Sequence, residues 1–328
     1  MKIIEQYLEK LKARDLVVVL PEGQDVRVVQ AARIIRDKGI AEPVLLGKNE
    51  DIAKAKGQAG EDLAGIECID PKQSVHLESY IDTYRTGRAE MAEGVARRLV
   101  SRPLFYGGMM VGCGAADAMV GGVAHATASL IQAGVLTIGL QPGITTVSSY
   151  FLMVIPKFQG EIDKPFIYAD CAVNIDPTAE ELADIALASA ASAAKLLKEE
   201  VRVALLSYAT RGSATGSSVA KVKAALTIAQ ERNPGLAIDG EFQADTAIIP
   251  QVAAKKVKDS SKVAGKANVL IFPDLDAGNI GYKLTQYMAG AQAIGPFLQG
   301  FAKPITDLSR GASVEDIIAA AVITLAQV

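Results

Sequence analysis

Short runs of apolar residues recur along the chain, and segments with helical spacing separate them. The first run covers residues 16–20 and ends at Pro21, Glu22 and Gly23. Similar strand-like runs lie at residues 43–46, 66–69, 118–120, 203–206, 236–238 and 268–272. Because continuous apolar runs bounded by turn residues are typical of strands buried on both faces, the pattern predicts a parallel sheet and an α/β fold.

Apolar residues three and four positions apart predict helices between these runs, over residues 25–38, 76–100, 178–197, 219–229 and 317–325. Gly39 stands where a glycine commonly ends a helix. Thr178 and Glu181 have the spacing of a capping box, and so do Ser313 and Asp316. These pairs therefore mark two helix N-termini.

Length and composition narrow the class of protein. A chain of 328 residues favours two domains, and 50% hydrophobic with 22% charged residues is typical of a soluble globular protein. The 34 basic and 37 acidic residues nearly balance, Trp is absent, and aromatic residues make up 5%. This composition disfavours a nucleic-acid partner, which would need a basic surface and aromatic side chains for base stacking.

The few histidines and cysteines limit metal binding and redox chemistry. His76, His125, Cys68, Cys113 and Cys171 are widely spaced and form no zinc-binding motif, so we expect no metal site. The odd number of cysteines and the lack of an N-terminal signal segment favour a cytoplasmic location with the thiols in the core. No apolar segment approaches the ~20 residues of a membrane span, so no membrane partner is expected.

Chemistry in an open α/β sheet is expected beyond the carboxyl ends of its strands. After the strand at 203–206, residues 207–218 combine hydroxyl groups, two glycines and Arg211 before a helix. They could cradle an anion or form a solvated loop with a serine cap. Asp274 and Asp276 follow the strand at 268–272 and could hold Mg²⁺, but an ordinary turn explains them as well.

The glycine-rich segment 107–122 lacks a dinucleotide-binding motif, so close packing is the better interpretation. Beyond it, Thr127 could hydrogen-bond a ligand, while His125 is interpreted as a structural histidine in preference to an acid or base.

The segment 303–316 gathers an arginine, serines and a carboxylate at the start of a helix. Asp316 is explained most simply as the acidic half of a capping box, and Arg310 could equally be a surface charge. The same residues could also form an anion clamp with a hydroxyl group and a carboxylate base.

Five short motifs, in order along the chain, resemble the phosphate acetyltransferase family, which is related to the phosphate butyryltransferases. They are Leu-Pro-Glu-Gly at 20–23 with Asp25 and Arg27, Gly-Asn-Ile-Gly-Tyr-Lys at 278–283, Gly-Pro at 295–296, Gln-Gly at 299–300 and Asp-Leu-Ser-Arg-Gly at 307–311. The resemblance covers essentially the whole chain. It implies an acyltransferase that interconverts acetyl-CoA and phosphate with acetyl phosphate and CoA, by direct attack of the thiolate on the acyl carbonyl.

The resemblance also implies roles for individual residues. Asp316 is expected to take the proton of the CoA thiol, Ser309 to hydrogen-bond near the sulfur, and Arg310 to bind the phosphoryl group. An arginine before residue 90 belongs to the family site; Arg85 fits best, with Arg88 as the alternative. The residues expected to bind substrate are Arg85, Thr127, Ser207, Arg211, Ser213, Asn279, Tyr282 and Lys283.

Two positions depart from the family pattern. Gln132 and Tyr287 stand where the family carries arginines, whereas Arg211 replaces the usual lysine and keeps its charge. The loss of two positive charges is expected to weaken CoA binding, because each arginine–phosphate contact contributes ~1.5–3 kcal/mol.

The resemblance implies two three-layer α/β domains with an interdomain cleft, like those of the isocitrate and isopropylmalate dehydrogenases, in a homodimer. Residues 1–148 and 298–328 are expected to form the first domain, and residues 149–297 the second. CoA is then a substrate, and no permanently bound cofactor is expected. Three other functions stay open: a non-catalytic acyl-CoA sensor, a phosphate acyltransferase for propionyl or butyryl groups, and a metal-dependent dehydrogenase.

Overall fold

A computed structural model describes residues 2–12, 14–88 and 90–328, which divide into two compact units. The first unit contains Met1–Gln141 and Phe301–Val328, and the second contains Pro142–Gly300. Residues 142–148 and 298–300, which we expected in the first domain, thus lie in the second unit. The reason is strand pairing: Ser148 pairs with Gln299, and the Gln299 amide donates to the Ser148 hydroxyl at 3.0 Å.

The first unit is built on a parallel sheet. Its strands are β1 (Val17–Leu20), β2 (Glu42–Leu46), β3 (Glu67–Ile69), β4 (Ala118–Gly121) and β11 (Ile305–Asp307). They lie in the order β3-β2-β1-β4-β11, and each neighbouring pair is parallel. Val18, Val19 and Leu20 of β1 are fully buried, as expected for a strand covered on both faces.

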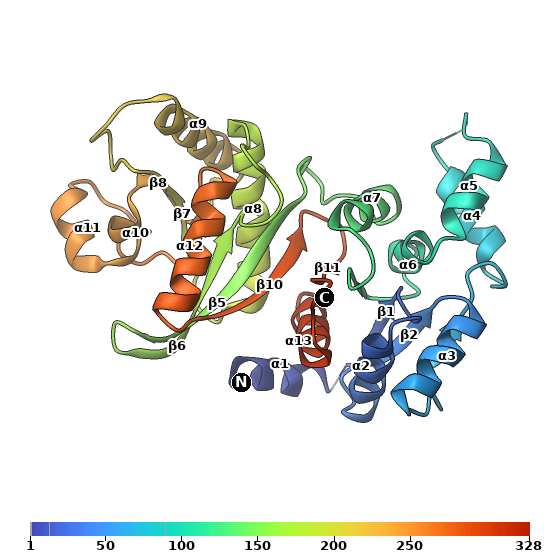
Figure 1. Ribbon diagram of the computed structural model, residues 1–328. Coiled ribbons are helices and arrows are strands. Elements are labelled where there is room, and N and C mark those ends of the chain that lie inside the picture. Colours follow the sequence, from blue (N-terminus) through green and yellow to red (C-terminus); the bar gives the residue numbers. More distant parts are fainter. Residues whose placement is uncertain (1, 13, 89) are drawn as a thin grey trace. The chain divides into compact units, whose positions relative to one another are not determined.

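Two groups of helices cover this sheet, and Figure 1 shows them on its two faces. One group comprises α1 (Lys2–Leu11), α2 (Val26–Asp37), α3 (Asn49–Ala59) and α13 (Val314–Leu325). The other comprises α4 (Leu77–Arg85), α5 (Glu93–Val100), α6 (Pro103–Gly112) and α7 (Thr127–Thr137). The β-α-β rhythm of the sequence therefore produces a three-layer unit.

The second unit combines parallel and antiparallel strands. They are β5 (Ser148–Phe158), β6 (Glu161–Ala169), β7 (Val203–Leu206), β8 (Ile238–Phe242), β9 (Val269–Ile271) and β10 (Gln292–Gln299). Their order is β10-β5-β6-β9-β7-β8. β5 pairs antiparallel with both β6 and β10, whereas the remaining pairs are parallel.

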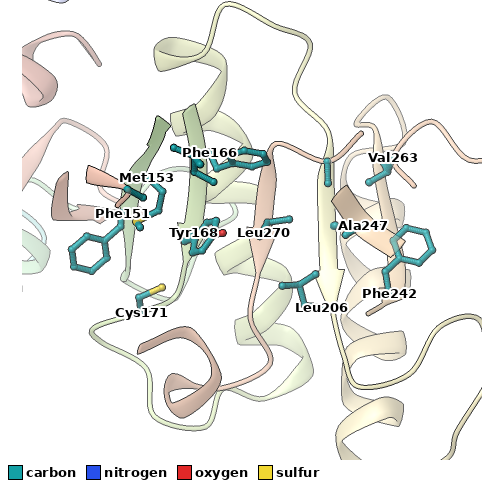
Figure 2. Close-up of a cluster of buried hydrophobic side chains, with 14 residues drawn as sticks. Phe151, Met153, Phe166, Tyr168, Cys171, Leu206, Phe242, Ala247, Val263 and Leu270 are labelled. Carbon is teal, nitrogen blue, oxygen red and sulfur yellow. The ribbon is translucent and has the colours of Figure 1, made fainter. Parts of the chain in front are cut away.

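Helices cover both faces of the second sheet as well. α8 (Ala179–Leu196) and α9 (Ser217–Arg232) contact each other on one face. The other face carries α10 (Ala244–Ile248), α11 (Pro250–Lys256) and α12 (Leu275–Met288). Alternate residues of β5 point into this side and join a buried apolar cluster with Phe166, Tyr168 and Leu270 (Figure 2). The α/β prediction is confirmed in both units, but the prediction of a parallel sheet was wrong for the second unit, because β5 pairs antiparallel with β6 and β10.

Two predicted elements were wrong in their extent. The helix expected over 76–100 is divided into α4 and α5, because Gly87 follows α4 with a left-handed φ of 76°. The strand expected at 236–238 begins at Ile238 and continues to Phe242. Buried Asp239 and Glu241 interrupt the apolar pattern that would have marked it. No helix of the described residues is long and apolar enough to cross a bilayer.

Candidate functional site

The turn between β11 and α13 holds Ser309 and Arg310, and the first turn of α13 holds Asp316, the third residue expected to do chemistry. Ser309, Arg310 and Asp316 are all exposed. Ser313 caps α13: its backbone N–H and its hydroxyl donate to Asp316 Oδ2 at 2.9 and 3.0 Å, and its hydroxyl accepts from the Asp316 N–H at 3.1 Å. The predicted capping box is thus confirmed, and it fixes the Asp316 carboxylate beside the turn that carries Ser309 and Arg310.

A buried carboxylate organises the neighbouring strand ends. Glu22 follows β1 and is 1% exposed. Its oxygens accept from the N–H groups of Gly122, Val123 and Ala124 at 2.8–2.9 Å, and one lies 2.7 Å from Nδ1 of His125. The loop after β4 is therefore wrapped around one carboxylate, which supports the structural interpretation of His125.

Asp307, the last residue of β11, connects this region to the start of α7. The hydroxyl of Thr127, the first residue of α7, donates a short hydrogen bond to Asp307 Oδ2. Oδ1 of Asp307 is buried and has no hydrogen-bond partner within the described chain. Burial, assisted by the nearby charge of Glu22, raises the pKa of Asp307 to about 6, although the Thr127 bond opposes the shift.

The two arginines proposed for one place in the site have different contacts. Arg88 stacks on the Tyr84 ring at 4.3 Å and donates to the carbonyl oxygens of Tyr84 and Leu136. Arg85 makes looser contacts: Nε donates to the Met91 carbonyl at 3.3 Å, and a terminal nitrogen lies 3.9 Å from Glu93. Arg88 is thus committed to the protein backbone, whereas Arg85 is the better candidate for a ligand.

In the second unit, the expected anion cradle between β7 and α9 is held by its own hydrogen bonds. Ser207 Oγ accepts from the Ala209 N–H at 3.2 Å, and Ser213 Oγ accepts from the Thr210 N–H at 3.0 Å. Arg211 has a left-handed φ of 49° and pairs with Asp239 at 2.8 Å and Asp259 at 3.2 Å. Two carboxylates therefore balance the charge that we expected to face a ligand.

The remaining predicted substrate-binding residues lie on α12. The amide of Asn279 donates to the Cys171 carbonyl at 3.1 Å. Tyr282 stacks on Phe151 with ring centroids 4.2 Å apart, and Lys283 Nζ lies 5.8 Å from the Tyr282 ring centroid. Asp274 caps this helix by accepting from the Ala277 N–H at 2.9 Å, which agrees with the turn interpretation of this acid.

The remaining candidate segment is explained by packing. The glycine-rich segment 107–122 includes the C-terminal part of α6, a helix that is buried along most of its length. A Cβ on Gly108 would lie 2.0 Å from the hydroxyl of Thr137, so glycine permits α6 to approach α7. No three His, Cys, Asp or Glu side chains gather into a candidate metal site in the part of the chain that the structure describes.

Two functional candidates escaped prediction from residues alone, Glu22 and Asp307. Each stands at the carboxyl end of a strand, which is a usable signal. What the sequence does not reveal is that β1, β4 and β11 are parallel neighbours, so that their ends meet. Without the strand order, a buried carboxylate looks like any turn acid.

Comparison with known proteins identifies the family of this chain. A profile of the phosphate acetyl/butaryl transferase family matches residues 2–325. The chain is 45% identical over 329 residues to a phosphate acetyltransferase of Acetivibrio thermocellus, covering 100% of this chain and 98% of that protein. A phosphotransacetylase structure from Staphylococcus aureus matches with a TM-score of 0.91 at 36% identity, covering 99% of this chain and 98% of the other.

A more distant structural likeness concerns the fold alone. A 4-hydroxythreonine-4-phosphate dehydrogenase from Klebsiella pneumoniae matches with a TM-score of 0.52 at 12% identity, covering 96% of this chain and 98% of the other. The dehydrogenase-like fold that we expected is thus confirmed. With a family profile that spans nearly every residue and relatives well above 30% identity, the chain belongs to the phosphate acetyl/butaryl transferase family.

Proposed function

We propose that this protein is a phosphate acetyltransferase, which moves an acetyl group between phosphate and CoA. In the direction of thioester formation, the CoA thiol loses its proton to Asp316, and the thiolate attacks the carbonyl carbon of acetyl phosphate. The C–S bond forms as the C–O bond to phosphate breaks, and phosphate leaves with the electron pair. Ser309 donates a hydrogen bond near the sulfur, and Arg310 stabilises the charge on the phosphoryl group.

The observation that carries this proposal is the turn before α13 together with the first turn of that helix. Ser309, Arg310 and Asp316 are exposed within eight positions of each other, and the capping box orients the carboxylate. Every capping bond to the side chain uses Oδ2, so we assign the thiol proton to Oδ1. A hydroxyl group, a cation and a carboxylate base at one helix start are the groups that this transfer needs.

The binding residues follow from the same proposal. Arg85 and Thr127 contribute to the phosphoryl site, and Ser207, Arg211, Ser213, Asn279, Tyr282 and Lys283 bind CoA. Because Asp239 and Asp259 already pair with Arg211, this arginine must exchange a partner to reach a phosphate. Together with Gln132 and Tyr287 in place of the family arginines, this pairing predicts weak binding of CoA.

The decisive experiment measures the reaction of acetyl phosphate with CoA as loss of free thiol. Asp316→Asn keeps an oxygen that accepts the capping bonds, so the fold should survive while kcat falls by orders of magnitude. Glu315→Gln is the matched control, because Glu315 is an exposed carboxylate in the same helical turn. Near-normal turnover in Asp316→Asn would remove Asp316 from the mechanism.

The same assay separates the alternatives. Saturable binding of CoA by the wild-type protein without turnover would favour an acyl-CoA sensor. Faster reaction with propionyl or butyryl phosphate than with acetyl phosphate would assign a longer acyl group.

We also propose that two copies of the chain associate and that the protein acts in the cytoplasm. An exposed apolar stripe on α12 supports association: Ile280, Leu284 and Met288 are 57%, 52% and 82% exposed. Their spacing places them on one face of the helix. Cys68, Cys113 and Cys171 are free thiols, which is compatible with a reducing compartment. The expectation that all three lie in the core was wrong, since Cys171 is buried but Cys68 is half-buried and Cys113 is exposed.

A further inference from the structure

Arg27, which is far away in the sequence, hydrogen-bonds to the backbone of the turn that carries Ser309 and Arg310. Nη1 of Arg27 donates to the carbonyl oxygen of Arg310 at 2.9 Å and to that of Ala312 at 2.7 Å. These contacts join residues 283 and 285 positions apart. Both carbonyls lie between Ser309 and the capping box, so Arg27 binds the backbone of the proposed catalytic turn itself.

Asp25 holds the other side of the same guanidinium group. Nε and Nη2 of Arg27 donate to the two carboxylate oxygens of Asp25 at 3.0 and 2.8 Å. Asp25 also caps α2, since its Oδ1 accepts from the Arg27 N–H at 2.9 Å. The Arg27 side chain lowers the pKa of Asp25, and Asp25 raises the pKa of Arg27, so both groups stay charged near neutral pH.

The planarity of the guanidinium group makes this arrangement specific. One edge forms the fork with the carboxylate, and the remaining nitrogen then points in a direction set by the plane of the guanidinium group. A lysine ammonium at the same place could bind either the carboxylate or the carbonyls, but it has no rigid fork to fix both. Arg27 is therefore suited to setting the position of the turn and not only to adding charge.

We propose that Arg27, oriented by Asp25, is a positioning residue that holds the 309–313 turn so that Ser309, Arg310 and Asp316 keep their reactive arrangement. The inference rests on the proposed acetyl transfer for its effect on rate, but its geometric part stands independently. Displacement of reacting groups by about 1 Å can lower a rate ~100-fold, so a clamp on this backbone is expected to act on kcat.

The chain offers a closely matched control on the same helix. Arg33 forms the same fork with Asp37 through Nε and Nη2, and its Nη1 donates to the carbonyls of Asp62 and Ala64. Arg33→Lys thus removes a similar set of interactions, a carboxylate fork and two carbonyl contacts, from a segment unrelated to the site. If the proposal is right, Arg27→Lys lowers kcat roughly 10- to 100-fold at unchanged KM for CoA and acetyl phosphate, whereas Arg33→Lys changes neither constant.

Hydrogen exchange of the backbone amides of residues 311–316 gives a readout that does not depend on activity. Exchange should accelerate in Arg27→Lys and not in Arg33→Lys. Asp25→Asn keeps a good helix cap but loses the charged fork, so its amide exchange should be intermediate between wild type and Arg27→Lys. If Arg27→Lys does not fold, Asp25→Asn takes its place in the test.

The outcomes separate this inference from the proposed function. Equal kinetic effects of both lysine variants, or unchanged amide exchange in Arg27→Lys, would overturn the clamp. A change confined to KM would also overturn it, because Arg27 would then contact a substrate directly. If the wild-type protein shows no acetyl transfer, the proposed function fails, while the exchange measurement still decides whether Arg27 holds the turn.

Discussion

Asp307 is a buried acidic residue whose two carboxylate oxygens have different surroundings. It is 6% exposed, one of its oxygens is occupied by the Thr127 hydroxyl, and the other has no partner among the described residues. A buried carboxyl group without full compensation favours its neutral form, which is why its pKa rises. Asp307 thus makes the stability of the first unit depend on pH.

The sign of that dependence follows from proton binding. With a pKa of about 6 in the folded state, Asp307 keeps a proton that it has lost from the unfolded chain above pH 4. The free energy of unfolding should therefore fall as pH rises from 4 to above 6, by roughly 2–3 kcal/mol from this group. In Asp307→Asn, this contribution to the pH dependence of the free energy of unfolding should be absent.

Urea unfolding of wild type and Asp307→Asn at pH 4 and pH 8 tests this prediction. The free energy of unfolding of Asp307→Asn minus that of wild type should be more positive at pH 8 than at pH 4, by roughly 2–3 kcal/mol. Asp15→Asn, at an exposed carboxylate of the same unit, is the control and should leave the pH dependence unchanged. A constant difference between Asp307→Asn and wild type at the two pH values would contradict the assignment.

At the scale of elements, the position of α12 depends on a glycine, Gly278, where no side chain fits. A Cβ on Gly278 would lie 2.2 Å from the carbonyl oxygen of Asp170. The amide of Asn279, the next residue, donates to the Cys171 carbonyl, so the helix is tied to the same segment. The Asp170 carboxylate, in turn, accepts from the N–H groups of Ala172, Val173 and Asn174, which leaves this segment little freedom to move.

Gly278→Ala should therefore lower the free energy of unfolding by roughly 3 kcal/mol, the upper end of the usual cost of overpacking. Gly57→Ala is the matched control: Gly57 also lies within a helix, α3, but a Cβ there meets no atom within 4 Å. That variant should be stabilised by about 0.5–1 kcal/mol, because alanine restricts the unfolded chain more than glycine does. Denaturant unfolding measures the free energy of unfolding of both variants. Similar effects of the two substitutions would show that the backbone of Asp170 moves to accommodate the added Cβ.

At the scale of the whole molecule, the α12 stripe groups several exposed apolar side chains on one helix. Burying Ile280, Leu284 and Met288 against a second copy would remove apolar surface from water, which drives most protein association. Leu284→Glu should place a charge in the proposed contact and convert dimers to monomers. Sedimentation velocity measures the state directly.

Val75→Glu is the control for that experiment, since Val75 is 90% exposed and lies in the other unit. It should leave the oligomeric state unchanged. A wild-type protein that sediments as a monomer at micromolar concentration would contradict the proposed dimer.

Local patterns predicted much of the fold because they depend on neighbours in sequence. The apolar runs of β1, β2, β7 and β9 and both capping boxes appear where expected. The errors occur where tertiary contacts override the pattern. In β8, for example, Arg211 compensates buried Asp239, so the strand could include a residue that looked like part of a turn.

The sequence by itself determined the α/β class, the two capped helix starts, and, through its motifs, the candidate residues Ser309, Arg310 and Asp316. Only the tertiary structure decided which strand ends meet, that Glu22 binds a loop 100 positions away, and that Arg27 grips a turn 283 positions away. The physical reason is that helix and strand patterns reflect contacts within a few residues, whereas these carboxylate and guanidinium contacts depend on how the strands are ordered in the sheet.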